Sequence, residues 1–534
     1  MFLSISFYAG LVAVVGYLVQ RFDLLSKLFT VLLPLIYPIK DIENGTPIPS
    51  LPFDFPNGQG NVEKFLHGHQ NSLKWGSKYG SLYRIWSGFH SEMWKLGLNP
   101  KNRISCLRML TIPSNFFRVV SRPEHIEAIF RDSHTHIKAA ANDSGYLMHQ
   151  LLGSCLGLVS NSEWKTIRKA TEPPFLRTAT GQYVRLCEDA AAQHIESIFG
   201  NKPGASTTNA QIHPYGDLRI YPFIALADIL YGGLTPELKE QLLEIIPNRD
   251  SVFRAMIQGG LTRFPISRFL PLKPLRELYQ FKTEWAKWND DTHAEALRKR
   301  DRGEPPAPII DMYAKVSEVP GGMSREALLQ TLDEMLFANL DVSIGGLAWS
   351  LAFIAALPHV QEKLLHEIRT QMVDDEQRSA YLLSQSNYLH YILLESSRLR
   401  PVVAFSVAQS CPNPRRLGNF VFPAGTKFIV DADALNMRDP LWAPDNMTFR
   451  PERWADVSAR RAKDIRYCYW RFGFGPRVCL GKYIVDLMMK TLIVELVRGW
   501  DIKLENEKKE QWAWNQDNWS LDPSMRIACT KRTD

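Results

Sequence analysis

A glycine-rich run at residues 472–481, Phe-Gly-Phe-Gly-Pro-Arg-Val-Cys-Leu-Gly, constrains the fold of this chain more than any other part of its sequence. A cysteine sulfur binds iron as the thiolate, and backbone N–H groups and nearby positive charge stabilise that form. The run surrounds Cys479 with residues of this kind. Gly475 and Gly481 lack a Cβ, so each can adopt a positive φ and let the backbone pass close to a flat macrocycle. The run therefore predicts a haem beside Cys479.

Two further residues of the run fit the same site. Arg477 offers a fork of donors suited to a carboxylate such as a haem propionate, and Phe472 is expected to cover the sulfur side. A glycine-rich loop around a buried cysteine is the usual interpretation of an isolated Cys-x-Gly pair, but five matched positions favour the haem. The run resembles the haem-binding signature of the cytochrome P450 family, Phe-x-x-Gly-x-Arg-x-Cys-x-Gly, at every defined position.

The resemblance implies a fold class and a cofactor. Cytochromes P450 are mainly α proteins, with a large helical domain and small β-sheets that enclose haem b. Here the resemblance implies that Cys479 is the axial ligand of the haem iron and that an N-terminal transmembrane helix precedes the domain. The helical pattern after residue 481 fits a helix that begins beside the iron.

A second pair of residues resembles a propionate contact of the family. Trp164 and Arg168 are four residues apart and so lie on one face of a predicted helix. In the family, a Trp-x-x-x-Arg pair reaches a haem propionate; a surface cation–π pair is the alternative. Many relatives also carry an arginine soon after the strand expected at residues 402–407, where Ala408 stands here. We therefore expect haem anchoring to rely on Trp164, Arg168 and Arg477.

Three charged residues resemble a structural network of the family. Glu395 and Arg398 are three residues apart on one face of an otherwise apolar helix, and Arg453 follows in a Pro-Glu-Arg-Trp sequence. A carboxylate flanked by two arginines can satisfy its lone pairs through bidentate hydrogen bonds. Glu-x-x-Arg alone is usually a solvated helix pair, but its order and spacing relative to Arg453 favour a buried trio that holds the loop before Cys479.

The predicted distal helix departs from the family pattern. Residues 337–346 lie where members carry Ala/Gly-Gly-x-Asp/Glu-Thr-Thr/Ser, and Val342 stands in place of the common threonine. The threonine hydroxyl and the acid deliver protons during oxygen activation in the family, and valine cannot. Asp341, Asn339 and Ser343 are the candidate catalytic residues, although Ser343 is about 100° further around an α-helix than Val342. An acid that caps a helix irregularity is the alternative for Asp341.

An apolar segment at residues 2–19 predicts a membrane anchor. Its 18 residues would make a helix about 27 Å long, close to the roughly 30 Å of a bilayer's hydrocarbon core. A cleaved signal peptide is the alternative, but a basic n-region is missing. We expect a transmembrane anchor at residues 1–20, a membrane-proximal segment with a proline-rich hinge at 21–58, and a catalytic domain at 59–534.

Positive charge on one side of that anchor predicts its topology. Arg21, Lys27 and Lys40 follow the anchor, so the positive-inside rule leaves the catalytic domain in the cytosol. We therefore expect a single-pass protein of the endoplasmic reticulum membrane. Residues 24–39 are apolar again, and the sequence leaves open whether they enter the interface or pack on the domain.

Composition excludes several other classes of protein. The net charge of +7 arises from 63 basic residues interspersed with 56 acidic ones, which argues against a nucleic-acid partner. The seven cysteines are widely spaced and include no Cys-x-x-Cys pair, which favours reduced cytosolic thiols. No internal repeat or long Gly/Ser linker divides the chain after residue 60, so we expect one large domain.

The resemblance implies a haem-thiolate monooxygenase that inserts one oxygen atom from O2 into a small organic substrate. The distal run suggests fungal secondary metabolism, with a peptide-derived compound as one option. No flavin or iron–sulfur segment is present, so the expected electron donor is NADPH–cytochrome P450 reductase, with cytochrome b5 as a further candidate. Val342 leaves an isomerase, dehydratase or oxidative-coupling enzyme as an alternative. A non-catalytic haem sensor or carrier is an alternative of another class.

Overall fold

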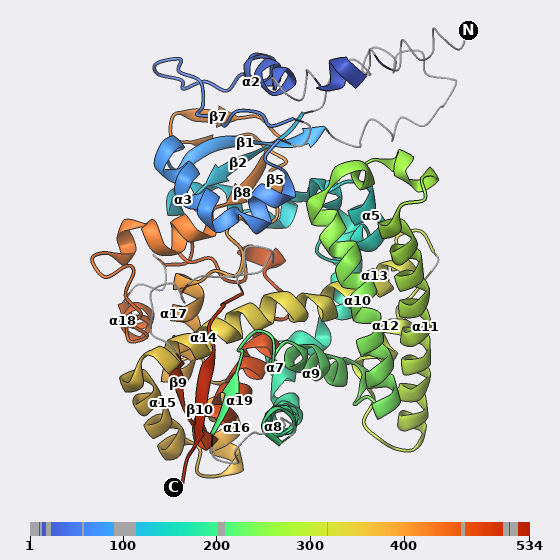
Figure 1. The fold of residues 1–534 in the computed structure, drawn as a ribbon, viewed down its shortest axis with the longest axis vertical. Coiled ribbons are helices and arrows are strands. Elements are labelled where there is room, and N and C mark those ends of the chain that lie inside the picture. The colour runs from blue at the N-terminus through green and yellow to red at the C-terminus, as the bar shows by residue number, and fades with distance from the viewer. Residues whose placement is uncertain are drawn as a thin grey trace.

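The computed structural model describes residues 10, 13–17, 23–55, 58–89, 114–200, 209–317, 319–460, 465–505, 512 and 522–533. Figure 1 shows a β-rich region at one end, with helices making up the rest of the molecule. The predicted mainly α fold with small sheets is confirmed. The helices are α2 Leu24–Ile36, α3 Gly68–Tyr79, α4 Pro123–Phe130, α5 Tyr146–Leu152, α6 Asn161–Thr171, α7 Arg177–Thr180, α8 Val184–Gly200, α9 Ile220–Tyr231, α10 Pro236–Gln258, α11 Lys273–Asp301, α12 Pro308–Ala314, α13 Arg325–Ala338, α14 Ile344–Ala356, α15 Pro358–Gln371, α16 Asp375–Leu383, α17 Tyr388–Leu399, α18 Arg453–Arg460 and α19 Lys482–Gly499.

Three small sheets accompany the helices. The largest has the order β1-β2-β8-β5-β3, with β2 and β8 parallel and the other neighbours antiparallel. A three-stranded sheet has the order β4-β10-β9, and β6 and β7 form a hairpin. The strands are β1 Leu82–Phe89, β2 Ser114–Val120, β3 Ile137–Lys138, β4 Asn209–Ile212, β5 Gln409–Ser410, β6 Arg415–Leu417, β7 Phe420–Phe422, β8 Lys427–Val430, β9 Trp500–Leu504 and β10 Ile527–Lys531.

One long helix runs through the middle of the molecule. It comprises α13, the π-helical segment Asn339–Ser343 and α14, and Figure 1 shows it reaching from the right-hand helices to the centre. The Ser324 hydroxyl caps its start by accepting a hydrogen bond from the backbone N–H of Ala327, at 3.1 Å. Within the described part of the chain, it is the one helix of 18 or more residues apolar enough to cross a membrane, but 89% of its most apolar window is buried. It is therefore a core helix.

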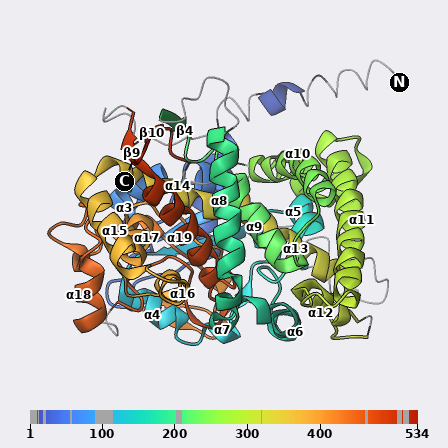
Figure 2. The same ribbon diagram turned by 90° about the horizontal axis from the view of Figure 1, so that it is seen from below.

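The remaining helices pack around this one. The pair α10 and α11 lies at one edge, and α19 and α8 pack together nearer the centre, as the two perpendicular views show (Figures 1 and 2). Helix α19 is buried along most of its length, including Ile484, Leu487 and Leu492. The predicted helix after residue 481 is thus confirmed, and it begins where the cysteine run ends.

The prediction of a strand at residues 402–407 is wrong. The backbone there has no ladder partner except an isolated antiparallel bridge between Phe405 and Asp431. Two backbone hydrogen bonds join this segment to the end of β8, from the Ser406 N–H to the Val430 carbonyl oxygen at 3.0 Å and from the Ala432 N–H to the Ala404 carbonyl oxygen at 2.8 Å. The regular ladder begins at β5, and Ala408 is 2% exposed in the core beneath the main sheet.

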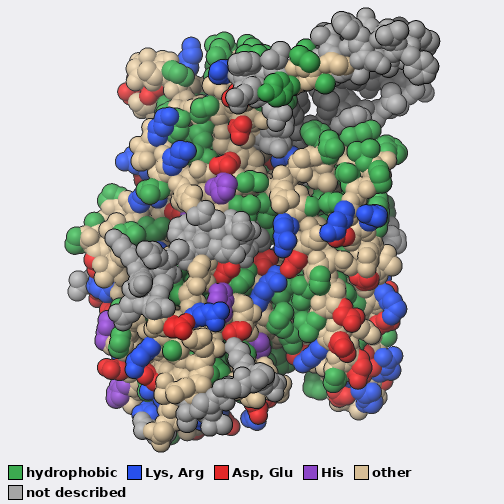
Figure 3. Space-filling view, in the orientation of Figure 1, with side chains coloured by type: hydrophobic (Ala, Val, Ile, Leu, Met, Phe, Trp, Pro, Cys, Tyr) green, Lys and Arg blue, Asp and Glu red, His purple; other side chains and the backbone are tan. Residues whose placement is uncertain are grey.

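The amino-terminal region is described in part. The predicted anchor at residues 1–20 lies outside the described residues except for residue 10 and the helical residues 13–17. Helix α2 packs on the domain through Leu33, which contacts Phe53 and Trp86 in a small apolar cluster. Its other face is exposed, and Figure 3 shows apolar side chains along that end of the molecule. The exposed apolar residues of the helix are Leu24, Leu28, Val31, Leu32, Leu35 and Ile36.

Candidate haem site

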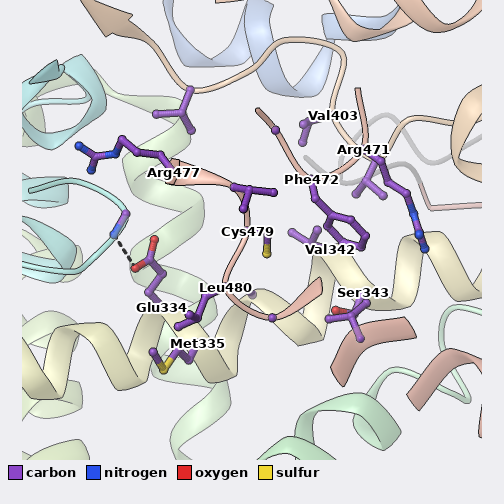
Figure 4. A pocket seen from close by; sticks show the side chains of 18 of the residues that line it. Glu334, Met335, Val342, Ser343, Val403, Arg471, Phe472, Arg477, Cys479 and Leu480 are labelled. Carbon is purple, nitrogen blue, oxygen red and sulfur yellow. Dashed lines mark hydrogen bonds between the residues drawn. The ribbon is translucent and has the colours of Figure 1, made fainter. Parts of the chain in front are cut away.

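A cavity of about 460 Å³ lies between the cysteine run and the long central helix. Its walls come from the run itself, from α13, the π-helical segment and α14, from residues 401–409, and from the loop and helix around residues 156–168. Figure 4 shows Cys479 near the middle of this site, with the central helix crossing behind it. Most lining side chains are apolar, so a large flat apolar group is well suited to the space.

The cysteine run folds tightly because two of its glycines adopt left-handed backbone conformations. Gly473 has φ 84° and Gly475 has φ 70°. A Cβ on Gly475 would lie 2.0 Å from the hydroxyl oxygen of Ser133, so this position also requires glycine for space. Gly481 differs from the prediction because its φ is −80°, and a Cβ there would make only ordinary contact with Val485. The fold of the chain itself therefore does not require glycine at 481.

The sulfur of Cys479 faces the cavity. The backbone N–H of Cys479 donates to the carbonyl oxygen of Phe472 at 2.9 Å, which closes the loop around it. Figure 4 shows the Phe472 ring beside the sulfur. Burial raises the pKa of the Cys479 thiol, and a backbone hydrogen bond from Gly481 opposes that rise. Cys479 keeps exposed surface and lines the cavity, as an iron ligand would.

Three cationic side chains line one edge of the cavity. The Arg477 guanidinium lies 5.0 Å from the centroid of the Trp164 ring and donates to the carbonyl oxygen of Val159. Arg168 donates to the carbonyl oxygen of Val478 at 3.2 Å, next to the cysteine. The structure thus brings together the three residues that the sequence suggested for propionate contacts, and all three line the cavity.

The third cation, Lys138, was missed by the sequence reasoning. It lies on β3 directly opposite Gln409 of β5, and both residues line the cavity. Burial lowers the pKa of Lys138 to about 7, with the charge of Arg477 adding to the effect. Ala408 points into the core, so position 408 supplies no cation to the cavity. Lys138, on the neighbouring strand β3, supplies one from a position close by. A two-residue strand leaves no sequence pattern that could have identified Lys138.

The donor set and the shape fit a haem. A single thiol faces the cavity, the walls are mainly apolar, and Lys138, Arg168 and Arg477 supply positive charge along one edge for two carboxylates. All six cysteines of the described residues are free of disulfides, and five of them are buried. Cys479 is the exception, because its exposed surface faces the cavity.

A buried charge network lies beside the cysteine run. Glu395 and Arg398 are both 0% exposed. One oxygen of Glu395 accepts from Arg398 at 2.8 Å and from Arg453 at 2.9 Å, and the other accepts from Arg398 at 3.0 Å and from Trp454 at 2.9 Å. The structure brings the predicted trio together and adds Trp454. None of these four residues lines the cavity.

The distal wall contains a π-helical turn. A π-helix uses i→i+5 hydrogen bonds and so fits an extra residue into one turn. Asn339, Val342 and Ser343 consequently all line the cavity, together with Gly346. The Ser343 hydroxyl donates to the side-chain oxygen of Asn339 at 2.6 Å, and the Asn339 amide donates to the carbonyl oxygen of Met335 at 2.7 Å. Ser343, a candidate from the sequence, therefore lines the cavity alongside Val342 although one residue step separates their side chains.

Asp341 lies on another face of the same turn. It does not line the cavity. Its carboxylate accepts from the Tyr215 hydroxyl at 3.1 Å and from Arg219 at 3.2 Å, and Arg219 also contacts Asp250 at 2.7 Å. The Arg219 and Asp250 side chains are 26% and 23% exposed. Asp341 therefore links the distal helix to the partly exposed residues Arg219 and Asp250, and no local sequence pattern groups these residues.

Comparisons with known proteins agree with this geometry. The family model described as cytochrome P450 matches residues 86–524. The chain is similar to the cytochrome P450 monooxygenase aclC of Aspergillus oryzae, with 37% identity over 500 residues that cover 93% of this chain and 94% of the relative. It is 36% identical to the monooxygenase asaD of Aspergillus flavus, over 95% of this chain and 91% of the relative. It is 31% identical to gliC of Aspergillus fumigatus, over 92% and 91%.

A core helix crossing behind a cavity-facing cysteine, with cations along one edge, defines a haem-thiolate protein. The chain belongs to the cytochrome P450 family. It is a haem-thiolate monooxygenase that binds haem b through a cysteine thiolate, takes electrons from a redox partner and acts on small molecules.

Proposed function

We propose that this enzyme inserts one oxygen atom from O2 into a small, mainly apolar substrate of fungal secondary metabolism, with a peptide-derived compound as one option. The observation that carries the proposal is the Cys479 sulfur facing a largely apolar cavity of about 460 Å³. The similarity to fungal cytochrome P450 monooxygenases along nearly the whole chain supports it.

The thiolate of Cys479 would bind the haem iron, and a bound haem would supply the reductive activation of O2. Gly475 and Gly481 would permit its close approach, and Phe472 would shield the thiolate. Trp164, Arg168 and Arg477 would hold the haem carboxylates. Glu395, Arg398 and Arg453 hold the backbone before the cysteine run, which keeps the sulfur in place.

Asn339, Ser343 and Asp341 are the proposed proton path in the absence of a threonine at 342. The hydrogen bond between Ser343 and Asn339 places a hydroxyl and an amide in the cavity wall, where they can hold a proton or an ordered water. Asp341 is the proposed point of proton exchange with solvent, since it contacts Tyr215 and lies beside the partly exposed pair of Arg219 and Asp250. A shift of the π-helical turn or a bridging water would then connect Asp341 to the cavity.

The proposed setting is the endoplasmic reticulum membrane, with residues 1–20 as a single-pass anchor, 21–58 as the membrane-proximal segment and 59–534 as a cytosolic catalytic domain. The exposed apolar face of α2 supports contact between the membrane-proximal segment and the lipid surface. NADPH–cytochrome P450 reductase is the proposed electron donor, docking near the cysteine run, with cytochrome b5 as a second candidate.

The test is turnover by the purified full chain with that reductase in lipid vesicles. Candidate substrates are first screened for a low-to-high-spin shift of the haem absorbance, and binders are then incubated with and without NADPH and O2. Product that gains one oxygen atom and requires both reagents supports the proposal. Product formed without them would indicate the isomerase or dehydratase alternative that Val342 left open, and an oxidised product without added oxygen would indicate oxidative coupling.

A further inference from the structure

Glu334 is an acidic side chain in the wall of an otherwise mainly apolar cavity. It lies on α13, five residues before Asn339, and it lines the cavity together with Met335 and Leu158. The part of its surface that remains accessible faces this space. Figure 4 shows its carboxylate between the central helix and the neighbouring loop, on the same side of Cys479 as Arg477. An ionisable group in such a position is costly to bury and calls for a physical reason.

The surrounding chain is built to receive this carboxylate. The backbone N–H of Gly157 donates to Oε2 of Glu334 at 2.9 Å. A Cβ on Gly157 would lie 1.8 Å from Oε1, so glycine at 157 leaves the space that the carboxylate occupies. The Cys155 thiol supplies a second hydrogen bond. A carboxylate has about four lone-pair sites, so part of its acceptor capacity is left for another donor.

Two cations, Lys138 and Arg477, stabilise the negative charge of Glu334 without forming an ion pair with it. Burial raises its pKa, whereas the hydrogen bonds from Gly157 and Cys155 and the charges of Lys138 and Arg477 oppose the rise. Among the described residues, none forms an ion pair with Glu334. The two cations thus favour a carboxylate without occupying its remaining lone pairs.

A purely structural role does not account for the charge. Two neighbouring side chains of α13 hold the same loop: Gln330 accepts from the backbone N–H of Ser154 at 2.7 Å, and Thr331 accepts from that of Leu156 at 3.2 Å. Both are neutral, and neither lines the cavity. Glu334 continues this series of loop contacts, but it is the member that is charged and faces the cavity.

We propose that Glu334 is a specificity-determining residue, which accepts a hydrogen bond from an N–H or O–H group of the substrate and so orients it in the cavity. The inference rests on the proposed function and narrows its substrate class. The favoured ligands are small, mainly apolar molecules with a secondary amide, as peptide-derived compounds have. Their N-alkylated counterparts lack the donor and would leave the buried acceptor unpaired.

The test uses pairs of aromatic amides that differ by one N-methyl group, beginning with N-benzylbenzamide and N-benzyl-N-methylbenzamide. Binding to the holoenzyme is followed by the spin-state shift of the haem absorbance. The wild-type chain should prefer the N–H member of a pair by about 10- to 100-fold, the range expected for a hydrogen bond to a charged group. Glu334→Gln keeps the size and an acceptor for Gly157, and it should reduce this preference to about threefold or less.

Two further variants separate recognition from loop anchoring. Thr331→Val removes a neighbouring loop contact outside the cavity and should leave the N–H preference unchanged. Gly157→Ala places a Cβ where Oε1 stands and should reduce the preference as Glu334→Gln does. Equal preference in wild type and Glu334→Gln, loss of preference in Thr331→Val, or no binding by any pair would overturn the inference. The reduced carbon monoxide complex of every variant is recorded as a control. A thiolate-type spectrum in each shows that haem ligation is intact, so a failed amide test would count against the role of Glu334 and not against the proposed monooxygenase function.

Discussion

The two sides of the cavity differ in backbone structure and in the hydrogen bonds that hold their side chains. On the thiolate side, the cysteine run is closed by glycine turns and is flanked by Glu395, whose two oxygens accept hydrogen bonds from Arg398, Arg453 and Trp454. On the oxygen side, a π-helical turn replaces regular helix, and Val342 takes the place of a hydroxyl. The first side holds one atom in a fixed place, whereas the second combines polar groups that can exchange protons and partners. We infer from this contrast that the thiolate ligand is the part of the site this enzyme shares with its family. The features that set its own chemistry lie on the opposite wall, in the π-helical turn.

Breaking the network on the thiolate side should have the largest effect. Glu395→Gln removes the charge that two buried arginines share, and loss of one partner of a buried pair costs about 3–5 kcal/mol. That is a large part of the stability of a typical domain. We expect little or no haem-loaded protein, measured as haem per chain and as the denaturation midpoint. Glu127→Gln, in an exposed pair with Arg131, should cost less than about 1 kcal/mol and serves as the control.

On the oxygen side, Ser343→Ala should leave the fold intact and damage proton delivery. It removes the hydroxyl that contacts Asn339 in the cavity wall. We expect product formed per NADPH to fall roughly hundredfold, the lower end of the contribution of a positioned proton donor, with hydrogen peroxide released instead. Ser350→Ala, which removes a hydroxyl from the same helix outside the cavity, is the matched control. Unchanged coupling in Ser343→Ala would remove Ser343 from the proton path.

A smaller effect is expected for Asp341→Asn, because this side chain does not line the cavity. Asparagine can keep contacts to Tyr215 and Arg219 but cannot carry a proton as a carboxylate does. We expect about a tenfold loss of coupling and a larger solvent deuterium isotope effect on turnover. If turnover, coupling and the isotope effect all match the wild type, Asp341 is only a structural partner of Arg219.

A pH dependence of the stability also belongs to the thiolate side. His390 lies 3.8 Å from Asp486, which pairs with Arg471 beside the cavity. Burial lowers the pKa of His390 to about 3 from its ordinary value of 6.5. The unfolded chain therefore binds one more proton than the folded chain between these values. The contribution of neutral His390 is complete above about pH 6.5 and declines as the pH falls toward 3.

His390→Gln should flatten the acid side of the stability profile. Between about pH 6 and 4, the dependence of unfolding free energy on pH should be smaller by up to about 1.4 kcal/mol per pH unit. The exposed His359→Gln is the control and should leave the slope unchanged. Denaturant unfolding across this pH range measures both, and equal slopes in wild type and His390→Gln would exclude this histidine as the cause.

The same contrast explains how much the sequence could predict. The cysteine run and the residues around Glu395 lie in short motifs with fixed spacing, so the sequence predicted their grouping, and the helical fold followed from the resemblance. Lys138, Tyr215 and Arg219 come from separate elements that meet only in the folded chain, and no local pattern marks them. The π-helical turn depends on which backbone groups pair, and side-chain periodicity does not report that. This is why the sequence did not show that Ser343 and Val342 both line the cavity, and why Gly481 was expected to have a positive φ that it does not adopt.

The central claim is that Cys479 provides the thiolate ligand of a catalytic haem. The most direct measurement is the carbon monoxide difference spectrum of the reduced full-length protein, recorded for the wild type and for Cys479→Ser at equal haem content. We expect the thiolate-type absorbance band in the wild type and its loss in the variant. A wild-type protein that retains haem but lacks this band, or a variant that keeps it, would show that Cys479 is not the ligand.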